Sequence, residues 1–206
     1  MSQPLILLVG AGGHARACID VIEQEGRFAI AGLVGMPDEV GGDVLGYPVL
    51  GSDADLPALH ERCHNALVTL GQIHSPEPRI QLFFVLERLG FTLPTVVSPF
   101  GHVSHHANLG AGSIVMHGAI VNAGARIGRN CILNSRTLVE HDAVIQDHCH
   151  LSTGSVVNGS ARIGSGSFLG SGSVLREGIA LGERCLVGMG LAVRKSHPAH
   201  SRILLQ

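Results

Sequence analysis

Aromatic residues are scarce in this chain: they make up 3% of its 206 residues, and tryptophan is absent. Aromatic side chains bury the most area in ordinary protein cores, so we expect a narrow core filled by aliphatic residues. Charged residues are also few, at 15%, and the formal net charge is −2. This balance gives no electrostatic reason to expect nucleic-acid binding.

Long hydrophobic runs and disulfide patterns are missing as well. The opening apolar run, Leu5–Val9, is shorter than a signal or membrane segment and has no basic flank. We therefore expect a cytoplasmic protein without a membrane segment. Three of the five cysteines are separated by multiples of six residues, and these are Cys131, Cys149 and Cys185. We interpret them as small core residues in one column rather than as disulfides or metal ligands.

A strict period of six dominates the second half of the chain. Every sixth residue from Val103 to Val193 is aliphatic, and the residue two positions earlier is small except at Ile179 and Leu191. Glycine often follows the aliphatic residue, as Gly110 does, which suits a chain that bends sharply after each short strand. This period is typical of a solenoid of short strands wound in stacked coils. A β-sandwich would not keep its phase through so many repeats.

The first ninety residues have a different organisation, in which strands and helices alternate. We expect strands at residues 5–9, 28–34 and 66–70, a short extended segment at residues 47–51, and helices at residues 15–25, 56–63 and 78–89. This alternation predicts a small Rossmann-like α/β domain with a parallel sheet. The expected domains are residues 1–91 and 92–206.

A glycine-rich turn follows the first strand. The pattern Gly10-x-Gly12-x-x-Ala15 between a strand and a helix is the signature of dinucleotide folds, in which the helix N-terminus offers free N–H groups to a phosphate. The acid that usually holds a ribose is missing after the second strand, where Gly35 stands and the first acid is Asp38. Nicotinamide binding is therefore disfavoured. A nucleotide diphosphate or a purely structural turn both remain open.

These features together resemble the PglD/NeuD family of bacterial sugar acetyltransferases. The resemblance rests on the Gly-x-Gly-Gly-His turn, the repeat, and the stretches 134–145 and 148–154. It implies a left-handed parallel β-helix of hexapeptide repeats, an exception to the usual right-handed crossover. It also implies a homotrimer with active sites between subunits, and acetyl-CoA as the co-substrate.

The resemblance assigns catalysis to one corner of the β-helix. The histidine matching His141 is the family's catalytic base, and the acid after it, here Asp142, tunes that base. Histidine can exchange a proton near neutral pH, as a base acting on an amine must. A coil of three hexads stacks residues eighteen apart at roughly 4.8 Å, which places Gly159 above His141. We expect the Gly159 N–H to stabilise the oxyanion, and the family position agrees.

The resemblance also implies two binding regions. Coenzyme A is expected at His150, Ser171 and Met189, of which Ser171 and Met189 share one outward column, although the family usually has glycine at the position of Met189. The ending Ser196–His200 also departs from the family's Gly-Val-Pro-Ala-Lys. The nucleotide sugar is expected against the first domain, at Gly12, Gly13, His14, Gly35, Asp38, Gln72 and Ile73.

The sequence thus predicts an acetyl-CoA-dependent N-acetyltransferase that acts on the 4-amino group of a nucleotide-linked, UDP-favoured, 4-amino-4,6-dideoxy sugar. O-acetylation of a sialic-acid-type sugar is the nearest alternative. Two others are a non-catalytic scaffold and a zinc enzyme like the γ-type carbonic anhydrases, with His117, His148 and His150 as ligands. His117 lies outside the column of His141, and the zinc reading leaves the α/β domain unexplained, so we expect no metal.

Overall fold

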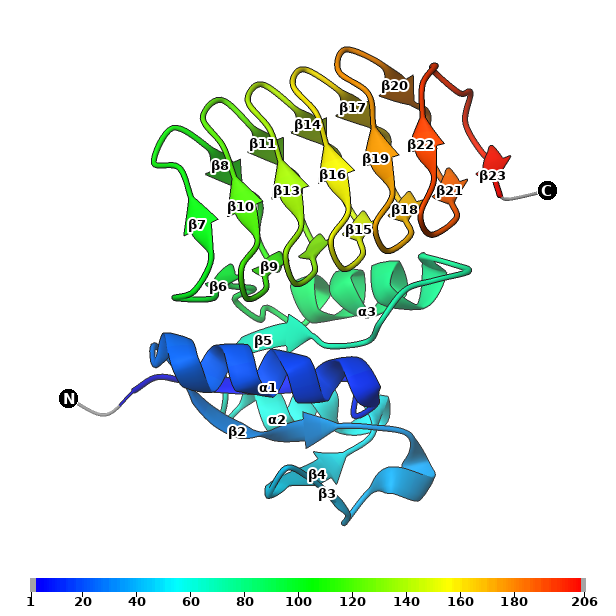
Figure 1. The fold of residues 1–206 in the computed structure, drawn as a ribbon. Coiled ribbons are helices and arrows are strands. Elements are labelled where there is room, and N and C mark those ends of the chain that lie inside the picture. The colour runs from blue at the N-terminus through cyan, green and yellow to red at the C-terminus, as the bar shows by residue number, and fades with distance from the viewer. Residues whose placement is uncertain (1–2, 205–206) are drawn as a thin grey trace.

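A computed structural model describes residues 3–204 of the chain (Figure 1). Its first part is an α/β layer structure with a five-stranded sheet in the order β3-β4-β2-β1-β5. The pairs are parallel except β3 with β4, which is antiparallel. The elements are β1 (Leu5–Val9), α1 (Gly13–Glu25), β2 (Ala29–Val34), η1 (Pro37–Glu39), β3 (Asp43–Val44), β4 (Tyr47–Gly51), η2 (Asp53–Asp55), α2 (Leu56–His60), β5 (Asn65–Val68) and α3 (Glu77–Arg88).

The sequence pattern explains this layer well. Strand β1 is apolar throughout because both faces of the sheet are covered. Helix α1 buries Ala15, Cys18, Ile19 and Ile22 at helical spacing, and it ends where Gly26 adopts a left-handed conformation, with φ 67°. The helix expected over residues 56–63 is shorter than predicted, ending at His60. Among residues 3–204, no helix combines the length and apolar character that crossing a membrane would require.

The second part is a parallel β-helix of two-residue strands. Strands one coil apart pair eighteen residues apart, as Ile120 does with Leu138, which confirms the predicted coil length. The strands are β6 (Val96–Val97), β7 (His102–Val103), β8 (Asn108–Leu109), β9 (Ile114–Val115), β10 (Ile120–Val121), β11 (Arg126–Ile127), β12 (Ile132–Leu133), β13 (Leu138–Val139), β14 (Val144–Ile145), β15 (His150–Leu151), β16 (Val156–Val157), β17 (Arg162–Ile163), β18 (Phe168–Leu169), β19 (Val174–Leu175), β20 (Ala180–Leu181), β21 (Leu186–Val187), β22 (Ala192–Val193) and β23 (Arg202–Ile203).

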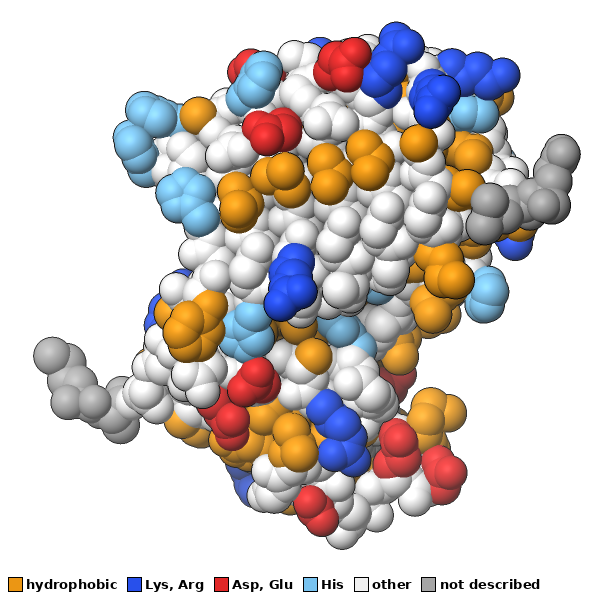
Figure 2. Space-filling view, viewed as in Figure 1, with side chains coloured by type: hydrophobic (Ala, Val, Ile, Leu, Met, Phe, Trp, Pro, Cys, Tyr) orange, Lys and Arg blue, Asp and Glu red, His pale blue; other side chains and the backbone are white. Residues whose placement is uncertain are grey.

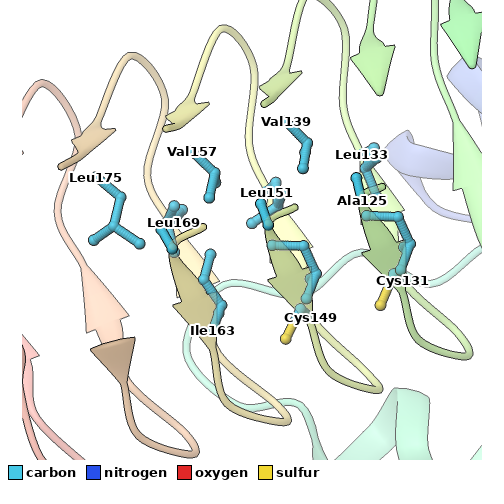
Figure 3. Packing of buried hydrophobic residues seen from close by; sticks show 14 of the residues in the cluster. Ala125, Cys131, Leu133, Val139, Cys149, Leu151, Val157, Ile163, Leu169 and Leu175 are labelled. Carbon is cyan, nitrogen blue, oxygen red and sulfur yellow. The ribbon is translucent and has the colours of Figure 1, made fainter. Parts of the chain in front are cut away.

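The second residue of each short strand points into the prism, since successive side chains in a strand face opposite sides. The predicted aliphatic column therefore forms the core, as Figure 3 shows for Leu133, Leu151 and Leu169 of successive coils. Cys131 and Cys149 are buried in the same core, as predicted. The narrow prism explains why the chain needs so few aromatic residues.

The first residue of each strand points outward and gives each of the three sheets its own character. The sheet β6-β9-β12-β15-β18-β21-β23 packs on the α/β part, where Val96, Ile114 and Ile132 are buried. The sheet β8-β11-β14-β17-β20 presents polar and charged residues such as Arg126. The sheet β7-β10-β13-β16-β19-β22, which we name the apolar sheet, carries a row of apolar side chains across the visible face (Figure 2). That row is Ile120, Leu138, Val156, Val174 and Ala192.

The sharp bends lie two residues later than we predicted. From Leu109 to Val187, the left-handed position is the third after each aliphatic residue, where the chain has either glycine, as at Gly118, or a polar residue, as at Asn130 with φ 54°. Glycine directly after the aliphatic residue has another cause. A Cβ at Gly128 would lie 2.6 Å from the backbone nitrogen of Asp147 in the next coil, so only glycine lets the coils stack this closely there.

Candidate active site

The corner between β13 and β14 brings His141 and Asp142 together. Neighbours on an extended strand point apart, but Asp142 adopts the left-handed conformation, with φ 59°, which aspartate tolerates better than most residues. The His141 Nδ1 and the Asp142 Oδ2 are 2.9 Å apart. A carboxylate only accepts hydrogen bonds, so Nδ1 is the donor to Asp142 and Nε2 is left free of this pair. Both side chains are about two-thirds exposed, at 66% and 67%.

Gly159 lies directly over the free nitrogen of His141. A Cβ at this position would lie 2.7 Å from the His141 Nε2, and the neighbouring Ser160 N–H donates to the His141 carbonyl at 2.9 Å. Within residues 3–204, the Gly159 N–H makes no hydrogen bond. The surrounding hollow, which we name the corner hollow, has a volume of about 590 Å³. Its lining residues are Glu140, His141, Asn158, Gly159, Ser160, Glu177 and Gly178.

A larger cavity of about 870 Å³ lies between the α/β part and the β-helix, and we name it the interdomain pocket. Most of the binding residues expected from the sequence line this cavity. They include residues expected for the nucleotide sugar and residues expected for coenzyme A. The cavity is mainly apolar, with Phe168, Leu186 and Val187 in its wall. The expected residues that line it are Gly12, Gly13, His14, Gln72, Ile73, His150, Ser171 and Met189.

Two histidines in this pocket are held in the neutral form. The ring Nδ1–H of His150 donates to the Gln72 carbonyl at 2.6 Å, which leaves its Nε2 as an acceptor. Burial lowers the pKa of His150 to about 4. Burial, followed by the charge of Arg79 and the proximity of His150, lowers the pKa of His14 to about 3. The His14 Nε2 is buried without a hydrogen-bond partner among the described residues, so it is available to a ligand.

The glycine turn opens the start of α1 toward the same pocket. No side chain caps this helix end, and a Cβ at Gly12 or Gly13 would meet nothing within 4 Å. The first backbone N–H groups of α1 are therefore accessible, and such groups favour an anion. At Gly10, with φ 119°, a Cβ would lie 2.8 Å from the backbone nitrogen of Leu70, so this glycine is needed for the close approach of β1 and the loop after β5.

Gly35 and Asp38 lie outside the interdomain pocket, in two separate cavities. Gly35 lines one of about 450 Å³, together with Gly12 and Glu39, whereas Asp38 lines another of about 320 Å³ with Arg16. Sequence reasoning missed Glu39. Its carboxylate accepts the Met36 N–H at 2.7 Å, because the turn that starts at Pro37 directs Glu39 back toward the glycine loop.

Within one chain, the corner hollow and the interdomain pocket lie at different corners of the prism. His141 follows β13 where the apolar sheet ends, whereas Ser171 and Met189 precede β19 and β22 where that sheet begins. The apolar sheet separates them. In the part of the chain that the structure describes, no three histidine, cysteine or acidic side chains are placed to share a metal ion.

A β-helix with eighteen-residue coils, an appended α/β domain and a histidine–carboxylate corner defines a class of hexapeptide-repeat acyltransferases. Comparisons agree: the PglD N-terminal domain family matches residues 5–79, and the hexapeptide repeat of succinyl-transferase matches residues 160–195. The chain belongs to the PglD-like family of hexapeptide-repeat sugar acetyltransferases. The expected fold, an α/β domain followed by a left-handed parallel β-helix, is confirmed.

Solved structures of similar proteins cover nearly the whole chain. PerB from Caulobacter crescentus, in complex with CoA and GDP-perosamine, is 31% identical with a TM-score of 0.90, over 98% of this chain and 94% of that one. The acetyltransferase domain of PglB from Neisseria gonorrhoeae, in complex with acetyl coenzyme A, is 29% identical with a TM-score of 0.88, over 97% and 95%. A histidine-to-asparagine mutant of perosamine N-acetyltransferase from Caulobacter crescentus, with CoA and GDP-perosamine, is 30% identical with a TM-score of 0.89, over 96% and 92%. No curated protein sequence matches significantly.

Proposed function

We propose that this enzyme transfers the acetyl group of acetyl-CoA to the 4-amino group of a nucleotide-linked 4-amino-4,6-dideoxy sugar. The placement of Gly159 over the free nitrogen of His141 carries this proposal, because it combines a base and an unused N–H donor at one open corner. We take UDP as the favoured nucleotide, as in the sequence analysis. GDP is the comparison to make, since the similar Caulobacter enzymes bind GDP-perosamine.

The proposed reaction is a direct acyl transfer. The amine nitrogen attacks the thioester carbon, and the His141 Nε2 accepts the proton that the nitrogen loses. The carbonyl oxygen becomes an oxyanion, which the Gly159 N–H stabilises. The carbon–sulfur bond then breaks, and His141 returns the proton to the leaving thiolate. Asp142 holds the imidazole in the correct tautomer and favours its protonated form.

The interdomain pocket fits the two substrates. The open N-terminus of α1 and the unpartnered His14 Nε2 offer donors to the diphosphate and the sugar. The column of Ser171 and Met189 forms an outward track beside the apolar wall of the pocket, suited to the pantetheine arm of acetyl-CoA. Glu39, rather than Asp38, lines the cavity that the glycine loop also lines, and we assign it to the ribose.

A homotrimer completes the proposed site. The apolar sheet exposes Ile120 and Val174, at 40% and 38%, and an exposed row of this kind is a typical subunit interface. The corner hollow lies along one edge of this sheet and the interdomain pocket along the other. Packing between copies therefore brings His141 of one subunit to the pocket of the next, in agreement with the arrangement implied by the resemblance.

The test is thiol release from acetyl-CoA with a panel of UDP-, GDP- and dTDP-linked 4-amino sugars. We expect turnover with one nucleotide series and a loss of 10²- to 10⁴-fold in kcat for His141→Asn. His105→Asn is the matched control. His105 occupies the same corner position two coils earlier, without a glycine above it, so its replacement leaves turnover unchanged. No thiol release with any sugar, or equal effects of both variants, would contradict the proposal.

A further inference from the structure

Arg79 is a buried cation with no carboxylate against it. It lies in the first turn of α3 and is 1% exposed. Burial lowers the pKa of its guanidinium to about 10, so the side chain is still charged at neutral pH. None of the ion pairs among residues 3–204 includes it. A charge removed from water is costly unless polar atoms replace the lost hydration, so its partners must be neutral oxygens.

Those oxygens come from both parts of the molecule. The Arg79 Nη1 donates to the carbonyls of Val68 and Leu70 at 3.0 and 2.6 Å, where β5 ends. The Nη2 donates to the carbonyl and the Oδ1 of Asn130, at 3.1 and 2.5 Å, on a corner of the β-helix. Asn130 returns a bond from its Nδ2 to the Arg79 carbonyl at 3.3 Å. One guanidinium therefore ties β5 to the β-helix.

The chain segment that Arg79 holds is the loop of residues 69–74, which runs from β5 toward α3. Leu70 and Gln72 of this loop line the interdomain pocket. Leu70 also lines the neighbouring cavity with Glu39, so this residue belongs to the wall that the two cavities share. A second contact is the hydrogen bond from the His150 Nδ1 to the Gln72 carbonyl at 2.6 Å, which holds the middle of the loop.

We propose that Arg79 is a positioning residue for the nucleotide-sugar site, because it clamps the start of the loop of residues 69–74 to the β-helix corner at Asn130. This inference rests on the proposed function. The clamp fixes the wall shared by the two cavities at the point where the nucleotide passes into the interdomain pocket. The track of Ser171 and Met189 is attached to other coils, and only His150 of the expected coenzyme A residues contacts the loop, so the clamp acts mainly on the nucleotide sugar.

The experiment measures KM for each substrate, kcat and Tm of the full chain and its variants. Arg79→Met keeps much of the side-chain volume and removes all four hydrogen bonds. We expect KM for the nucleotide sugar to rise at least tenfold, while KM for acetyl-CoA and kcat stay within twofold. Arg79→Lys retains the charge and part of the bonding, so it recovers part of the lost affinity. Asn130→Gly keeps the left-handed backbone, folds readily, and gives a smaller rise in the same KM.

Arg129→Met is the matched control. Arg129 also links α3 to the β-helix, through Glu87 at 3.0 Å and Asp147 at 3.4 Å, but it does not touch the loop. This variant lowers Tm without changing either KM. The proposal is overturned if Arg79→Met leaves KM for the nucleotide sugar unchanged, if both KM values rise together, or if the Arg79 and Arg129 variants behave alike.

A thermal-shift measurement separates this inference from the proposed function. With UDP or GDP alone as the probe, binding raises the Tm of the unmodified protein, and Arg79→Met loses most of that rise. A wild-type protein that shows this shift but acetylates no nucleotide sugar refutes the proposed function and leaves the clamp supported. Equal shifts in the wild-type protein and the variant refute the clamp, and no shift in either refutes both.

Discussion

Replacing Gly159 with alanine tests the proposed chemistry at a single methyl group. The added Cβ would lie 2.7 Å from the His141 Nε2, where ordinary contact begins at 3.4 Å. The imidazole must therefore move by about 0.7 Å, or the backbone that carries the oxyanion donor must move instead. Gly159 is not among the residues with positive φ, so alanine adds no backbone strain, and the contact with His141 is what the variant changes.

The size of the effect follows from that displacement. A misplacement of about 1 Å at a reacting group costs on the order of 10²-fold in rate, which corresponds to about 2.7 kcal/mol in the activation barrier. We therefore expect Gly159→Ala to lower kcat by on the order of 10²-fold. The fold and Tm should change little, because the corner hollow is open to solvent and its glycine supports no core packing.

A double-mutant cycle identifies His141 as the group through which the methyl acts. Steady-state thiol release is measured for Gly159→Ala, His141→Asn and the combined variant. Without the imidazole, the added methyl has no base to displace. The loss in kcat of the combined variant is therefore far smaller than the product of the two single losses. Full kcat in Gly159→Ala, or strictly multiplicative losses, would show that Gly159 does not act on His141.

Three further predictions concern other parts of the molecule. Asp142→Asn removes the carboxylate that fixes the imidazole tautomer and lowers kcat at least tenfold, by the same thiol assay, while Tm stays constant. Because burial lowers the pKa of His150 from 6.5 to about 4, the unfolded state binds more protons between these values, and the free energy of unfolding falls as the pH drops from 6.5 toward 4. Urea unfolding at pH 7 and 4.5 should show a smaller loss in the free energy of unfolding for His150→Gln than for the unmodified protein. An equal loss in both proteins would show that His150 is not its source. Leu138→Glu charges the centre of the apolar sheet, so light scattering of this variant should give the mass of a monomer in place of the proposed trimer, whereas an unchanged mass would exclude this sheet as the interface.

Most of the fold was predictable because the repeat leaves little freedom. An aliphatic residue at every sixth position and a small one two residues before it determine which side chains enter the prism, and Val121 and Ala119 occupy those places. The bend position was not predictable from glycine alone. At the left-handed corners a polar residue such as Asn130 can replace glycine, while glycine after the aliphatic residue serves close stacking of coils.

The candidate site was predictable in its parts but not in its arrangement. The motif indicated His141 and Asp142, and the register placed Gly159 above them, because stacking depends only on sequence separation. Asp38 and Glu39 are adjacent in sequence, and only the turn that starts at Pro37 decides which of them faces the glycine loop. The role of Arg79 depends on contacts between distant segments, which no local pattern indicates.

The most direct test of the account is a crystal structure of the His141→Asn variant with coenzyme A and an amino-sugar nucleotide bound. We expect the amine within about 2.6–3.2 Å of the position of the missing ring nitrogen, with the thiol beside the Gly159 N–H and the nucleotide in the pocket of the adjacent subunit. A thiol or an amine bound at another corner of the prism would contradict it.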